Sequence, residues 1–127
     1  MKKYMCFVVL ASLLLCSCTD QKYKVGTFSY TKHCEEYAHA EFGVHVPDPE
    51  SQEKTRILSA AEAVAIAKKY CRIPSPEISV DYDPFTGVYC VGFIQAIEVD
   101  GVTLYATGGQ NVYVNKDGIV LLNILGE

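Results

Sequence analysis

The chain has 127 residues, with 11 Lys or Arg against 15 Asp or Glu, and its net charge is −4 at pH 7. This acidic balance argues against nucleic-acid binding, which requires a basic patch. The length fits one domain rather than two.

The first residues have the pattern of a signal segment that is removed after export. Lys2 and Lys3 precede an apolar run at residues 6–16. This run is about half as long as a helix that spans a bilayer. A charged start, a short apolar stretch and a small residue before the break are typical of a cleaved signal. Without Lys2 and Lys3 the net charge becomes −6, which is compatible with a basic protein partner.

Either of two cysteines could be the residue that follows the cleavage point. Leu15 precedes Cys16 and is too bulky for the last position before a cut, whereas the small Ser17 precedes Cys18. The pattern resembles a bacterial lipoprotein signal with Cys18 as the site of lipid (palmitate) attachment. A plain secretion signal or an uncleaved anchor is the alternative.

The resemblance implies three parts: a signal peptide at residues 1–17, a lipidated tether at 18–27, and one α+β domain at 28–127. Several acyl chains would hold this domain on a membrane of the cell envelope. Thr19 stands where some bacteria place an aspartate that retains lipoproteins in the inner membrane. The outer membrane is therefore favoured over the inner membrane.

Three cysteines remain in the domain after processing. Cys90 lies in an apolar strand pattern and is interpreted as a core thiol. Cys34 and Cys71 lie on predicted helices, and we expect them to form the possible disulfide in an oxidising compartment.

Two helices are predicted before the strands begin. The first spans residues 29–42, where apolar residues recur at steps of three and four. Residues 46–54 form a loop. The second helix starts at a capping box of Ser59 and Glu62, carries small apolar residues on one face, and ends before Pro74.

The rest of the chain is predicted as antiparallel strands. Asp100-Gly101 is a two-residue hairpin turn, because both positions tolerate positive φ. We expect the two helices to cover one face of a curved sheet in an α+β domain. The predicted strands are residues 78–82, 88–99, 102–106, 110–115 and 118–125.

Several short patterns in the second half resemble a known family. They are the alanine-rich helix at residues 59–67, a strand at Tyr89, the pair Gly108-Gly109, and the turn and strand at residues 114–121. These residues resemble the small immunity proteins with a nuclear-transport-factor-2-like fold that accompany bacterial polymorphic toxins. The resemblance implies a cone in which two N-terminal helices pack on a curved four- to five-stranded antiparallel sheet. It also implies steric neutralisation of a toxin, with no enzyme activity and no cofactor.

A second resemblance uses some of the same residues. The helix at 59–67 followed by the turn at 83–87 is similar to a PepSY-type domain. That family implies an envelope protein that restrains a peptidase or senses peptides. A short helix on a three- or four-stranded sheet would favour this alternative.

The residues with catalytic or metal-binding chemistry form no convincing set. His33 adjoins Cys34, but neighbouring helical residues point about 100° apart. Glu35 and His39 are four apart and would need further metal ligands. Gly108-Gly109 precedes a strand, so the helix N-terminus of a phosphate cradle is missing. We therefore predict no catalytic residue, no metal site and no cofactor.

Four carboxylates lie near predicted strand ends. Asp81 and Asp83 resemble the start of a calcium loop but lack its closing glutamate. Asp81, Asp83, Glu98 and Asp100 are interpreted either as turn formers or as an acidic rim that meets a basic protein partner. They are the candidate partner-binding residues, with a toxin as the expected partner.

Overall fold

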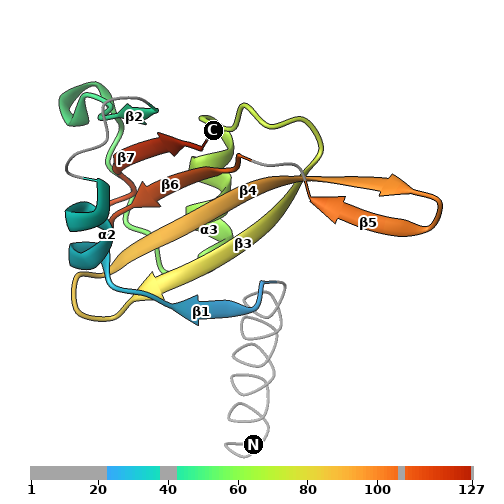
Figure 1. The fold of residues 1–127 in the computed structure, drawn as a ribbon. Helices are drawn as coiled ribbons and strands as arrows, with labels where there is room; N and C mark the ends of the chain where they lie inside the picture. Colours follow the sequence, from blue (N-terminus) through green and yellow to red (C-terminus); the bar gives the residue numbers. More distant parts are fainter. Residues whose placement is uncertain (1–22, 38–42, 106–107, 127) are drawn as a thin grey trace, which may run out of the picture.

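The computed structural model describes residues 23–37, 43–105 and 108–126, which form a seven-stranded mixed sheet (Figure 1). The described helices pack on opposite faces of this sheet. In chain order, the elements are β1 (Val25–Thr27), α2 (Tyr30–Tyr37), β2 (Val44–His45), a 3₁₀ helix (Pro49–Ser51), α3 (Ala60–Lys68), β3 (Pro76–Asp83), β4 (Val88–Val99), β5 (Val102–Tyr105), β6 (Gln110–Val114) and β7 (Val120–Leu125).

The strand order is β1-β3-β4-β6-β7-β2, and β5 pairs with β4 outside this path. Only β1 is parallel to its neighbour; the other described pairs are antiparallel. The strands from β3 to β7 occupy the predicted places, and β4 has the predicted bounds. β1 and β2 were not predicted from the sequence, because they are only three and two residues long.

Helix α3 begins at the predicted capping box. The Glu62 N–H donates to Ser59 Oγ at 3.3 Å, and Glu62 Oε2 accepts from the Leu58 N–H at 3.4 Å. The carboxylate therefore reaches one residue further back than in the standard box, while the Ser59 side chain satisfies the Glu62 N–H of the first turn. The helix ends at Lys68, earlier than predicted, and a turn carries the chain to the next strand.

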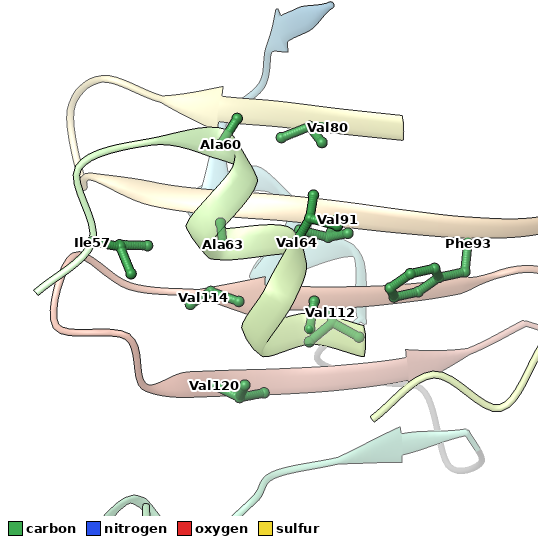
Figure 2. Close-up of a cluster of buried hydrophobic side chains, with 11 residues drawn as sticks. Ile57, Ala60, Ala63, Val64, Val80, Val91, Phe93, Val112, Val114 and Val120 are labelled. Atoms are coloured by element: carbon green, nitrogen blue, oxygen red, sulfur yellow. The ribbon is translucent and has the colours of Figure 1, made fainter. Parts of the chain in front are cut away.

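The main core lies between α3 and the four strands β3, β4, β6 and β7 (Figure 2). Ala63 and Ala67 are fully buried, and their small side chains allow the helix to lie close to the sheet. Alternate strand residues complete this core, as the period of two requires. Its buried members are Ile57, Ala60, Ala63, Val64, Ala67, Val80, Val91, Phe93, Val112, Val114 and Val120.

Helix α2 covers the opposite face of the sheet. Tyr30 and Tyr37 pack against a second buried cluster that includes Cys90 and Tyr113. The helix starts where the Tyr30 N–H donates to Asp83 Oδ2 at 3.0 Å. The described part of the first predicted helix is thus confirmed, and residues 38–42 lie outside the described residues.

The expected nuclear-transport-factor-2-like cone is wrong. It required two helices on one face of an antiparallel sheet with four to five strands, whereas the sheet is mixed, has seven strands and is covered on both faces. Consecutive residues of β6 explain the difference: Val112, Tyr113 and Val114 are all buried. A strand that is apolar on both faces needs a covering layer on each side.

A buried amide joins the end of α3 to the sheet. Gln110 is 1% exposed, and its Nε2 donates to the Tyr70 carbonyl at 2.6 Å and to Asn123 Oδ1 at 2.7 Å. Its Oε1 accepts from the Arg72 N–H at 2.8 Å. These bonds fix the turn after α3 against β6 and β7, as expected for a buried polar group that is fully satisfied.

Candidate functional site

The most distinctive surface is a hairpin that leaves the body of the sheet. β4 pairs with β3 up to Gln95 and with β6 up to Phe93, so residues 96–99 pair with β5 alone. Residues 96–105, which we call the arm, extend away from the rest of the sheet (Figure 1). An isolated two-stranded hairpin is marginally stable in water. Among the described residues, neither of the two buried clusters includes a residue of the arm.

One face of the arm is entirely aliphatic. The register pairs Ile97 with Leu104 and Val99 with Val102, and cross-strand partners share one face of a ribbon. These four side chains are 45%, 51%, 48% and 58% exposed, respectively. Grouped apolar exposure of this kind marks interaction surfaces, whereas single exposed apolar residues are common on any protein.

The tip of the arm is the predicted two-residue turn. Asp100 has φ 53° and Gly101 has φ 77°, as a type I′ hairpin turn requires. Glu98 and Asp100 are exposed and are the only charged residues of the arm. The tip is therefore acidic and carries no cation of its own.

The four predicted acidic residues do not form one surface. Asp83 pairs with Val88, and Glu98 lies ten residues further along β4, roughly 33 Å away at the rise of an extended strand. Asp81 is half-buried opposite Gly26 of β1, where an added side chain would collide with its carboxylate. Only Glu98 and Asp100 remain together at the arm.

Asp83 is a cap and a turn former. It is 2% exposed. Its Oδ2 accepts from the Tyr30 N–H and, at 2.7 Å, from the Thr86 hydroxyl, while its Oδ1 accepts from the Phe85 N–H at 2.9 Å. The Tyr30 N–H, followed by the Thr86 hydroxyl, holds the pKa of the Asp83 carboxyl below its usual value. Its position thus fits the turn-forming interpretation rather than an acidic rim.

A polar and aromatic cluster lies beneath α2. His33 Nδ1 and Tyr113 Oη share a hydrogen bond of 2.7 Å, and the two rings meet edge to face at 5.8 Å. Burial raises the pKa of Tyr113 above its ordinary value and that of Cys90 to about 12. Burial and then the Cys34 side chain raise the pKa of Tyr30 to about 12.

These raised pKa values keep the Cys90 thiol and the two phenols protonated at neutral pH. A nucleophilic thiol needs the opposite shift, toward the thiolate. The hydrogen bond between His33 Nδ1 and Tyr113 Oη fixes the imidazole ring against the sheet. This arrangement packs α2 on the sheet and keeps the Cys90 thiol in its protonated, weakly nucleophilic form.

A groove of about 450 Å³ opens beside α2, between that helix, β2 and β7. Its lining is mostly apolar and includes the half-buried Cys34. The lining residues are Tyr30, Cys34, Tyr37, Val44, Val46, Leu121 and Leu122.

The structure corrects the predicted disulfide. Cys34, Cys71 and Cys90 are free thiols. Cys34 is part of α2 on one face of the sheet, whereas Cys71 packs against the α3 core on the other face. The sheet separates the two sulfur atoms, because Cys34 lies on α2 on one face and Cys71 follows α3 on the other.

Within residues 23–37, 43–105 and 108–126, no three His, Cys, Asp or Glu side chains come together as a possible metal site. Glu35 is exposed on α2, and its predicted companion His39 lies outside the described residues. In this part of the chain no helix has both the length and the apolar character needed to cross a bilayer. Cys18 also lies outside the described residues.

Sequence reasoning missed the apolar face of the arm. The signal was present, since Ile97 and Val99 alternate with Glu98 on one strand and Val102 and Leu104 flank Thr103 on the next. This alternation predicts one covered face. The sequence alone does not show that both described helices, α2 and α3, pack on other parts of the sheet.

Comparison with protein-family models, with characterised proteins and with solved structures finds no match to this chain. The resemblances to immunity proteins and to PepSY-type domains therefore rest on the residues that carry them.

Proposed function

We propose that the chain is a lipid-anchored binding module of the cell envelope that restrains a partner protein by steric contact. The observation that carries this proposal is the uncovered aliphatic face of the arm, formed by Ile97, Val99, Val102 and Leu104. Closer to its start, β4 buries Val91 and Phe93 beneath α3, and Val88 and Cys90 on the face that α2 covers. A surface that only needed solubility would not keep four neighbouring aliphatic residues in water.

Binding is favoured over catalysis by the chemistry of the titratable groups. The cluster beneath α2 holds its thiol and phenols protonated, and Asp83 is fully engaged as a cap. The arm carries two carboxylates and no His, Lys or Cys. These arrangements suit a scaffold that presents a surface.

The partner class comes from the resemblance to immunity proteins. It supports a toxin that enters the envelope, where acyl chains on Cys18 would hold the module. The resemblance implied that a curved sheet contacts the toxin. In the fold found here, the arm would make that contact. Contact by the arm would obstruct the toxin's working surface without any chemical step.

The test is protection of cells that co-express the full chain with toxins encoded beside its gene. Val102→Asp and Leu104→Asp place a charge on the aliphatic face and should abolish protection. Phe85→Asp is the matched control, because Phe85 is 97% exposed at a turn away from the arm. If both arm variants protect as well as the unchanged chain, the arm is not the binding surface. If no adjacent toxin is neutralised, the toxin assignment fails.

One observation favours a second candidate function. α3 is nine residues long and packs on four antiparallel strands that follow it in the chain, β3, β4, β6 and β7. A short helix on such a sheet is the arrangement expected for a PepSY-type domain. In that case the chain would restrain a peptidase, and its addition to envelope peptidases should lower their rate. Protection from a toxin with no effect on peptidases would exclude this alternative.

A further inference from the structure

The outer edge of β5 is open. β5 pairs with β4 on one side, and within the described residues no strand pairs with its other side. The two-residue turn makes Val99 and Val102 a hydrogen-bonded pair. The alternation of an antiparallel ladder then directs the backbone N–H and C=O groups of Thr103 and Tyr105 outward. These groups can accept an additional strand.

This edge lacks the features by which proteins usually protect edge strands. Residues 96–105 contain no Lys, Arg or Pro, and the β4–β5 register is regular, without a bulge. The other two edge strands, β1 and β2, are only three and two residues long. Short edges, lysines, prolines and bulges are the common protections. Residues 96–99 of β4 also lack a second neighbour among the described strands, but this edge carries Glu98. β5, with four residues and no charge, is thus the edge that remains available for pairing.

The charges of the arm select among the possible occupants. Glu98 and Asp100 are both acidic, so a basic partner is complementary. A second copy of this chain would bring two more carboxylates and no cation in the same segment. An anionic lipid surface would be repelled by the acidic tip.

We propose that the partner adds an extended segment to the outer edge of β5. Alternate apolar side chains of that segment lie beside Val102 and Leu104, and a Lys or Arg lies near Glu98 and Asp100. Main-chain hydrogen bonds give affinity, and the aliphatic face and the acidic tip give specificity. This inference rests on the proposed binding function and specifies how the partner is held.

The experiment selects seven-residue peptides from a random phage-displayed library against the full chain in detergent micelles. The selected peptides should alternate apolar residues and contain Lys or Arg. Thr103→Pro removes the outward N–H without touching the ladder to β4, and should weaken binding by about tenfold or more. Thr103→Val keeps that N–H and is the matched control.

A second measurement does not depend on how the proline variant folds. Each selected peptide is synthesised with N-methyl groups on its odd amides or on its even amides. Only one edge of an added strand faces β5, so one of the two methylated forms should bind and the other should not. Equal binding of both forms overturns strand addition.

The acidic tip has its own variant. Glu98→Gln with Asp100→Asn removes both charges, and asparagine tolerates the positive φ of the turn. Basic peptides should bind about threefold more weakly or worse. Unchanged affinity overturns the charge assignment.

The other occupants give distinct results. Concentration-dependent association of the chain with itself, lost in Thr103→Pro, would assign the edge to a second copy and overturn the proposal. Binding of the arm to phosphatidylglycerol vesicles, lost in Leu104→Asp, would assign it to a lipid surface and also overturn it. If no peptide is selected while toxin protection depends on Val102 and Leu104, strand addition fails and the binding function stands.

Discussion

Replacement of Gln110 by leucine should destabilise the domain strongly. The change removes the partner of three groups: Asn123 Oδ1, which is buried, and the Tyr70 carbonyl and the Arg72 N–H, whose hydrogen bonds to Gln110 are part-buried. Each unpaired buried group costs about 1–3 kcal/mol, and the leucine side chain offsets about 1–2 kcal/mol by apolar burial. We expect a net loss of about 2–5 kcal/mol from a total stability of about 5–15 kcal/mol.

The assay is urea and thermal unfolding of the full chain in mild detergent, followed by circular dichroism. The melting temperature of Gln110→Leu should fall by about 8 °C or more. Gln95→Leu makes the same chemical change at a half-buried position of β4, and should change stability by less than about 1 kcal/mol. A loss below about 0.5 kcal/mol in Gln110→Leu would refute the account of this network.

A double variant separates hydrogen bonding from packing. Gln110→Leu with Asn123→Leu removes both members of the buried pair, so Asn123 Oδ1 no longer remains unpaired. The loss of unfolding free energy in the double variant should therefore be smaller than the sum of the two single losses, by about 1 kcal/mol or more. Additive losses would show that the pair is not coupled.

Three further predictions concern the caps, the thiols and a turn. The pKa of the Asp83 carboxyl is lower in the folded chain than in the unfolded chain, so the unfolded chain takes up protons first as the pH falls. The stability that this carboxylate contributes is therefore complete above its unfolded pKa and is lost as the pH drops through its folded pKa. Asp83→Asn should therefore be less stable at pH 7 and should flatten the acid limb of a urea-midpoint profile, whereas a parallel downward shift at all pH values would contradict this. Mass spectrometry without reduction should find no Cys34–Cys71 disulfide, and a peptide with this disulfide would contradict the placement of the two cysteines on opposite faces of the sheet. Alkylation of the folded chain should label Cys90 slowest, because it is buried and its pKa is raised to about 12. Gly118→Ala should lower stability by about 1–2 kcal/mol in urea unfolding, because this residue has φ 72° and an added Cβ would collide with the Thr55 carbonyl; no loss would contradict the turn geometry.

Local signals in the sequence predicted the elements that depend on local chemistry. The capping box at Ser59 and Glu62, the Asp100-Gly101 turn and the bounds of β4 all follow from capping, positive φ and β-propensity. The turn before β7 is of the same kind, since Asn115 Oδ1 accepts from the N–H groups of Asp117 and Ile119.

The arrangement of these elements in space was not predictable in the same way. The choice of face for α2 depends on Asp83, a strand residue 53 positions from the N–H that it caps. β1 and β2 are too short to carry a pattern. The partners of Gln110 come from β7 and from the turn after α3, so no spacing rule identifies them.

The candidate site also combines features that local sequence predicts with features that depend on the whole fold. The acidic turn at Asp100 was predicted, because a two-residue turn is a local feature. The exposure of Ile97 and Leu104 depends on which elements fail to cover them, and this is a property of the whole fold. The predicted bridge between Cys34 and Cys71 failed for a similar reason, since it assumed two helices on one face.

Site-specific photocrosslinking in cells tests the role of the arm most directly. A benzoyl-phenylalanine placed at position 102 should give one discrete adduct with a partner protein, and Leu104→Asp should remove it. The same group at position 85, where Phe85 is more exposed than any of the four aliphatic arm residues, should give no such adduct. Identical products from positions 85 and 102, or none from position 102 when the toxin is neutralised, would contradict a partner-binding arm.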